Sequence, residues 1–159
     1  MSNNRRLILI TGIPGTGKTF MGNYFQEHLG FLHIDMEEKP QRFSRSTNKF
    51  LASTDEDLVV TWGFSPVDLS AVQRVQRLGF FTTWFDGNRD AALRSFNRRG
   101  TVEERMFHIK LNNIEVCQIV SHLQHVQVNT FDEDGEFRSQ KDIADEILHE
   151  YEMDREPLI

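Results

Sequence analysis

The chain has 159 residues, of which 38% are hydrophobic and 26% are charged, and its formal net charge is -6. This length suits one domain with a substantial core. The negative charge argues against general binding to nucleic acid or to anionic membranes. No apolar run approaches the roughly 20 residues that a membrane-spanning helix needs, and the single Cys117 cannot form an internal disulfide. We therefore expect one cytoplasmic domain covering residues 1–159.

The predicted elements alternate between strands and helices. In chain order they are a strand at 6–11, a helix at 18–29, strands at 31–35 and 58–62, a helix at 66–78, a strand at 80–85, helices at 89–98 and 102–124, a strand at 126–131 and a helix at 140–152. The strands are short apolar runs, and the helices carry apolar residues three to four apart. Strands that are apolar on both faces and alternate with helices indicate a parallel sheet with helices on both sides, which is an α/β fold.

The segment 12–19, here called the P-loop, reads Gly-Ile-Pro-Gly-Thr-Gly-Lys-Thr and matches the phosphate-binding pattern G-x-x-x-x-G-K-[ST] in full. Because it joins a strand to a helix, its backbone N–H groups and the helix N-terminus can face phosphate oxygens. Lys18 adds positive charge for the β and γ phosphates, and the Thr19 hydroxyl is a candidate Mg²⁺ ligand. The other candidate nucleotide-binding residues of the loop are Gly12, Pro14, Gly15, Thr16 and Gly17. The pattern predicts a site for a nucleoside triphosphate.

The size of the chain, the P-loop and the alternating elements resemble the small P-loop kinases, such as adenylate, shikimate and gluconate kinases. The resemblance implies a three-layer sandwich around a five-stranded parallel sheet with strand order 2-3-1-4-5. It also implies ATP and Mg²⁺ as the nucleotide and the metal. A mobile helical lid is expected at about 88–124, between the fourth and fifth strands, and an acceptor-binding segment after the second strand.

Three arginines lie close together in the segment 85–100. Arg94 and Arg98 are four residues apart and would share a helix face, with Arg99 next to them. Guanidinium groups can stabilise the negative charge of a phosphoryl group during transfer. By the resemblance, Arg98 and Arg99 would contact phosphates as catalytic residues, and Arg94 would lie against the adenine ring. The alternative is a solvated basic helix face.

Asp35 ends the second predicted strand, at the edge where open α/β sheets place their ligands. Its carboxylate could orient or deprotonate an acceptor hydroxyl or hold a water on Mg²⁺, so it is both a catalytic and a metal-binding candidate. A turn residue or helix cap is the alternative.

P-loop enzymes usually carry an aspartate at the end of the third strand, where this chain has Thr61 and Trp62. Asp35 is the first candidate to replace that aspartate and Asp86 the second, while His33 is more consistent with packing.

The acceptor side is less defined by the sequence. Residues 62–64 follow the third strand and could form an aromatic wall of the acceptor pocket, or equally pack in the core. Arg42 and Arg45 could hold a carboxylate or phosphate of the acceptor, with a solvated segment as the alternative. Cys117 is predicted to lie in the core.

Together these features predict an ATP-dependent phosphotransferase that moves the γ-phosphoryl group of ATP to a small hydroxylated or phosphorylated metabolite. Lys18, Asp35, Arg98 and Arg99 are the catalytic candidates. The alternative is a non-catalytic ATP-binding module with a regulatory or partner-binding role, which the missing third-strand aspartate favours. The residues name neither the acceptor nor an oligomeric state.

Overall fold

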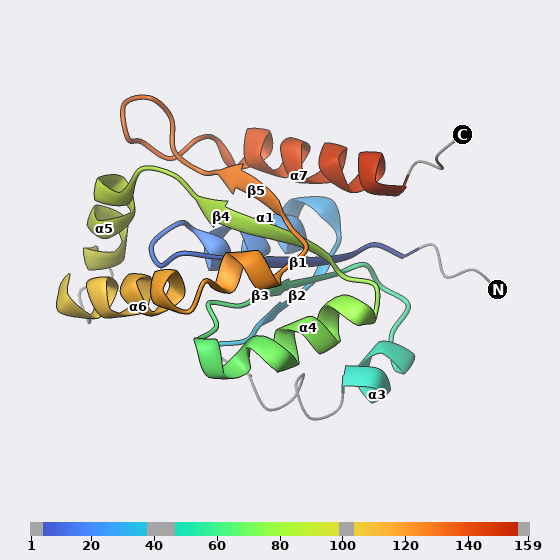
Figure 1. Cartoon of the computed structure of the whole chain (residues 1–159). Coiled ribbons are helices and arrows are strands. Elements are labelled where there is room, and N and C mark those ends of the chain that lie inside the picture. The colour runs from blue at the N-terminus through green and yellow to red at the C-terminus, as the bar shows by residue number, and fades with distance from the viewer. Residues whose placement is uncertain (1–4, 38–46, 99–103, 156–159) are drawn as a thin grey trace.

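The computed structural model describes residues 5–37, 47–98 and 104–155 (Figure 1). Five strands form one sheet in the order β2-β3-β1-β4-β5, and each neighbouring pair is parallel. The strands are β1 (Leu7–Gly12), β2 (Leu32–Asp35), β3 (Leu58–Thr61), β4 (Phe81–Asp86) and β5 (Val126–Asn129). The predicted strand order and parallel pairing are confirmed.

Helices cover both faces of the sheet (Figure 1). They are α1 (Lys18–Leu29), α3 (Thr47–Ala52), α4 (Leu69–Arg77), α5 (Arg89–Asn97), α6 (Glu104–Val116) and α7 (Gln140–Arg155), with 3₁₀ turns η1 (Pro66–Asp68) and η2 (Ile119–His122). Side chains of α1 and α7 share one core cluster, and side chains of α4, α5 and α6 share the other. The predicted three-layer α/β sandwich is therefore confirmed. Within the described ranges, no helix combines the length and the apolar character needed to cross a lipid bilayer.

The central strand β1 is buried on both faces. Ile8 and Ile10 belong to the cluster on the α1 and α7 side, and Leu9, between them, belongs to the opposite cluster. Alternate residues of a strand point to opposite faces, and burying each such side chain contributes about 1.5–3 kcal/mol. This packing holds the carboxyl end of β1, and with it the start of the P-loop, at one place in the molecule.

The segment between β4 and β5 differs in one respect from the prediction. The single helix predicted at 102–124 is divided, because α6 ends at Val116 and Gln118 adopts a left-handed conformation with φ 51°. That conformation breaks the helix before η2 begins. The expectation that Cys117 lies in the core is wrong: it falls in this break and is exposed.

Candidate active site

The P-loop curls between β1 and α1 because two of its glycines adopt left-handed conformations. Gly15 has φ 78° and Gly17 has φ 83°, a region that glycine occupies without steric cost. Thr16 Oγ1 and Lys18 Nζ each donate a hydrogen bond to the Ile13 carbonyl oxygen, at 2.8 Å in both cases. Lys18 is only 8% exposed, and a buried ammonium requires polar partners. The loop therefore draws its one charged side chain onto its own backbone.

The P-loop also packs tightly against neighbouring elements. A Cβ atom on Gly12 would lie 2.3 Å from the carbonyl oxygen of Phe85 on β4. A Cβ atom on Gly15 would lie 2.0 Å from the carbonyl oxygen of Ala92 on α5. Only glycine fits such approaches, so the loop and the first turns of α5 are held together. Figure 1 shows α5 lying beyond the ends of β1 and β4, beside this loop.

Thr19 and Asp35, the two predicted metal ligands, are brought together. Thr19 Oγ1 donates a hydrogen bond to Asp35 Oδ2 at 3.1 Å, and Asp35 Oδ1 accepts the backbone N–H of Glu37 at 3.0 Å. Mg²⁺ prefers oxygen ligands and is usually bound through one or two protein groups, with waters and phosphates completing its shell. The described residues contain no cluster of three or more His, Cys, Asp or Glu able to hold a metal by themselves. This hydroxyl–carboxylate pair fits a Mg²⁺ ion shared with a nucleotide.

At the end of β3, Thr61 stands where a carboxylate was expected, and it is hydrogen-bonded to His33 of β2. His33 Nε2 lies 2.7 Å from Thr61 Oγ1, and His33 Nδ1 lies 3.0 Å from Asn23 Oδ1 on α1. Gly22 leaves the room for this ring, because a Cβ there would come within 2.2 Å of Nε2. His33 is half-buried, in agreement with the packing role predicted for it.

Asp86, the second candidate for the missing carboxylate, is engaged at its own strand end. It accepts hydrogen bonds from the Gly87 backbone N–H at 2.8 Å and from Trp84 Nε1 at 3.2 Å. Arg89 Nε lies 3.3 Å from Asp86 Oδ1, the oxygen that also accepts the Gly87 N–H. These contacts favour a structural role for Asp86, so Asp35 is the better placed of the two acids.

A cavity of about 600 Å³ opens beside the P-loop. Its lining comes from the loop, from the segments after β2 and β3, and from α5 and α6: Gly12, Pro14, Gly15, Lys18, Met36, Glu37, Trp62, Gly63, Phe64, Ser65, Pro66, Asp68, Phe96, Lys110, Asn113 and Ile114. Trp62 and Phe64 are 8% and 7% exposed and belong to a core cluster. These aromatics therefore pack in the core and also line the cavity, while their contact with an acceptor stays a prediction.

Sequence reasoning missed five polar residues of this cavity: Glu37, Ser65, Asp68, Lys110 and Asn113. Glu37 follows Asp35 closely at the strand end, and its position there was the one available signal. Lys110 and Asn113 lie on α6, where packing of buried Phe107 and Ile114 decides which face turns toward the P-loop. No local pattern marks that face.

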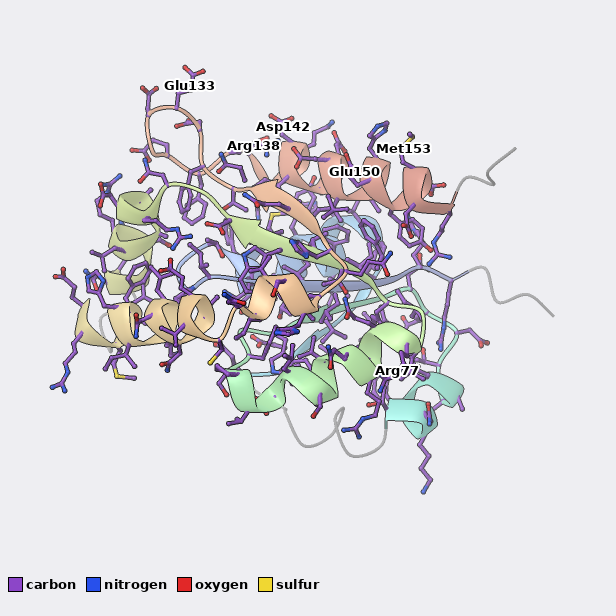
Figure 2. The ribbon with its side chains drawn as sticks, in the orientation of Figure 1. Arg77, Glu133, Arg138, Asp142, Glu150 and Met153 are labelled. Atoms are coloured by element: carbon purple, nitrogen blue, oxygen red, sulfur yellow. The ribbon has the colours of Figure 1, made fainter. Side chains whose placement is uncertain are left out.

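Arg94 reaches from α5 toward the connection between β5 and α7. Its Nη2 atom is 3.0 Å from the position that a Cβ on Gly135 would take. In the same connection, the Phe137 ring lies 3.1 Å from a Cβ built on Gly17 and stacks on Phe131 with centroids 4.6 Å apart. Phe137 thus lies against Gly17 of the P-loop, and Arg94 reaches the same β5–α7 connection. Figure 2 shows Glu133 at the tip of the same connection, pointing to solvent.

Of the other predicted arginines, only Arg98 belongs to the described residues. Arg98 follows the last residue of α5 as its C-cap, is exposed, and is not among the residues lining the cavity beside the P-loop. Arg99 lies outside the described residues, as do Arg42 and Arg45. The structure therefore brings together the P-loop, Thr19 and Asp35, with Arg94 at one side, and does not bring Arg98 into the cavity.

Comparisons with known proteins find the fold but no sequence relative. No protein-family model matches the chain, and no curated protein sequence matches it. A shikimate kinase from Acinetobacter baumannii in complex with shikimate has a TM-score of 0.70 at 17% identity, over 98% of this chain and 97% of its own. A gluconokinase from Sinorhizobium meliloti 1021 has a TM-score of 0.60 at 16% identity, over 91% and 90%.

A third similar structure is the tunicamycin resistance protein of Deinococcus radiodurans, with a TM-score of 0.66 at 16% identity, over 93% of this chain and 96% of its own. At such low identities the likeness concerns the fold, and it extends over nearly the whole chain. The chain has the three-layer α/β fold of the small P-loop kinases.

Proposed function

We propose that the chain is an ATP-dependent phosphotransferase acting on a small hydroxylated or phosphorylated metabolite. The supporting observation is that four residues of the P-loop, including its buried Lys18, line the same cavity as the aromatic side chains of Trp62 and Phe64. A cavity with apolar walls and a few polar groups is typical of small-molecule sites. Two of the similar structures are a shikimate kinase and a gluconokinase.

The residues of the site would each have a defined part. The P-loop N–H groups would bind the phosphates, and Lys18 would balance charge on the β and γ phosphates. Mg²⁺, held by Thr19 and Asp35, would supply further positive charge at the phosphate oxygens. An acceptor oxygen forms a bond to the γ phosphorus while the bond to the bridging oxygen breaks. ADP keeps that electron pair, and an acceptor hydroxyl releases its proton.

The proposal is tested by measuring ADP formation from MgATP against a panel of acceptors. A suitable panel contains shikimate, gluconate, glucitol, a nucleoside, nucleoside monophosphates and an aminoglycoside. ADP formation that depends on one of these compounds supports the phosphotransferase. Tight ATP binding without any acceptor response would instead favour a non-catalytic nucleotide-binding module. The lack of a carboxylate at the end of β3, where Thr61 contacts His33, is the observation that favours this alternative.

Thr19→Ala is expected to raise the Mg²⁺ concentration needed for half-maximal binding of an ATP analogue, by about 10-fold or more. The hydroxyl that contacts Asp35 is lost, while the phosphate-binding backbone is kept. Thr19→Ser is the matched control, because it keeps the hydroxyl and should behave like the wild type. A Mg²⁺ dependence unchanged in Thr19→Ala would remove this residue from the metal site.

Arg94→Ala and Arg98→Ala are expected to act on different kinetic parameters. Arg94 reaches the β5–α7 connection whose Phe137 lies against Gly17 of the P-loop, so its loss should raise KM for ATP more than it lowers kcat. Arg98 is predicted to contact the phosphoryl group during transfer. Arg98→Ala should therefore lower kcat on the order of 10²-fold and weaken ATP binding less. Steady-state kinetics with the active panel compound measures both. Wild-type kinetics in Arg98→Ala would mean that its exposed position on α5 is a solvated face.

A further inference from the structure

We propose that Asp35, the last residue of β2, and Glu37, which follows it, have different partners: Asp35 serves the metal, and Glu37 faces the acceptor. It follows that the group accepting the phosphoryl is an alcohol and not a phosphate. This inference rests on the proposed phosphotransferase function and names the chemical class of acceptor for the same site.

Both carboxylate oxygens of Asp35 are engaged in hydrogen bonds. One of its oxygens accepts a hydrogen bond from the Thr19 hydroxyl and the other accepts the backbone N–H of Glu37. The first bond holds the carboxylate at the start of α1, and the second ties it to the backbone two residues further along the chain. Met36 and Glu37 line the cavity beside the P-loop, whereas Asp35 does not. An acceptor in this cavity would therefore meet Glu37 and not Asp35.

Glu37 lies next to the lysine of the P-loop. Its Oε1 atom is 3.3 Å from the position that a Cβ on Gly63 would take, and Lys18 Nζ is 3.7 Å from the same point. Because Gly63 has no side chain, the Glu37 carboxylate and the Lys18 ammonium both lie beside the space that a Cβ would fill. Within the described residues, the structure records no hydrogen bond or ion pair of the Glu37 side chain. The carboxylate is exposed to the cavity.

Lys110 and Asp68 also line the cavity, but the group beside Glu37 is the one that this placement bears on. Lys18 would contact the γ phosphate, and the attacking oxygen must approach that phosphate from the cavity. A hydroxyl can donate a hydrogen bond to the Glu37 carboxylate, and bonds to a charged acceptor are the stronger kind. A phosphate dianion in the same place would be repelled by the carboxylate and has no proton to donate to it. Glu37 therefore favours an alcohol at the position of attack.

Two substitutions separate the two carboxylates. Each keeps the shape of the side chain and removes its charge. Asp35→Asn is expected to raise the Mg²⁺ concentration for half-maximal binding of a non-hydrolysable ATP analogue by about 10-fold or more, and Glu37→Gln should leave it unchanged. This binding measurement needs no acceptor. Glu56→Gln, an exposed glutamate before β3, is the control for the loss of one negative charge.

The second measurement uses the acceptor panel with the full chain. Wild-type protein should form ADP with an alcohol such as shikimate, gluconate or glucitol, and not with AMP, CMP or UMP. Glu37→Gln should lower kcat/KM for that alcohol by about 10²-fold while KM for MgATP stays as in the wild type. Glu37→Asp, which keeps the charge on a shorter side chain, should recover part of the loss.

Three results would overturn the inference, and they are distinguishable. A Mg²⁺ shift in Glu37→Gln equal to that in Asp35→Asn would put both acids on the metal. The second is an unchanged kcat/KM for the alcohol in Glu37→Gln, or a preference of the wild-type protein for nucleoside monophosphates. Either would remove the acceptor role of Glu37 and leave the phosphotransferase function unaffected. If no compound supports ADP formation by the wild type, the proposed function fails and the acceptor role of Glu37 fails with it.

Discussion

Replacing Lys18 with alanine is expected to lower both ATP affinity and acceptor-dependent turnover, each by about 10²–10³-fold. Lys18 is the only charged side chain of the P-loop. Its Nζ atom is held at the Ile13 carbonyl oxygen, 2.8 Å away, on the loop that would cradle the phosphates. Because the ammonium is only 8% exposed, its field is weakly screened by water, and its loss removes a strong attraction for phosphate oxygens. Calorimetric titration with an ATP analogue and an ADP-coupled assay measure the two losses.

Two controls make the Lys18 result specific. Lys18→Met keeps the buried aliphatic volume, so it separates the loss of charge from any loss of packing. Arg77→Ala removes one positive charge from α4, away from the P-loop and α5 (Figure 2), and should bind and turn over as the wild type does. A folded Lys18→Met protein with normal ATP affinity and turnover would show that the P-loop is not the nucleotide site.

The second large effect is expected from Gly15→Ala, compared with Gly30→Ala. Both glycines are left-handed, with φ 78° and φ 76°, so each substitution carries a similar backbone cost of about 1–2 kcal/mol. A Cβ on Gly30 meets nothing within 4 Å, whereas a Cβ on Gly15 would lie 2.0 Å from the Ala92 carbonyl oxygen. Gly15→Ala should therefore destabilise the fold by roughly 1–3 kcal/mol more than Gly30→Ala. Urea unfolding followed by tryptophan fluorescence gives both free energies.

The Gly15→Ala substitution should also weaken ATP binding, because the loop and α5 would have to separate. Gly30→Ala, at the far end of α1, should bind ATP normally. Equal unfolding free energies for the two variants would mean that α5 moves aside at little cost. In that case the close contact between the P-loop and Ala92 does not constrain the site.

Several features could be predicted because they depend on neighbouring residues along the chain. The P-loop is a continuous pattern, with glycines placed where its own turn needs them, and the helix after it begins at Lys18 and ends before Gly30 as expected. The strands were visible as short apolar runs because a central parallel strand is buried on both faces. The strand order, however, came from the resemblance to small P-loop kinases and was confirmed by the structure.

Packing between distant segments overrides local pattern at two places. Phe20 has helical spacing with other apolar residues of α1, yet it is 56% exposed. The face of α1 that packs on the sheet instead carries Met21, Gly22 and Phe25. Cys117 was expected in the core, but the left-handed Gln118 ends the helical segment beside it. The spacing of apolar residues alone predicts neither the exposure of Phe20 nor that of Cys117.

By itself the sequence determined the α/β class, the position of the P-loop and the residues of that loop, since each is set by the order of residues over a few turns of chain. Only the tertiary structure decided what surrounds the loop. Asp35 meets Thr19 because β2 and α1 pack together, and Glu37 shares a cavity with Lys110 because α6 folds back over the ends of the strands. Such contacts depend on the lateral order of strands and on which helix face is buried, and these are settled by the burial of the whole core.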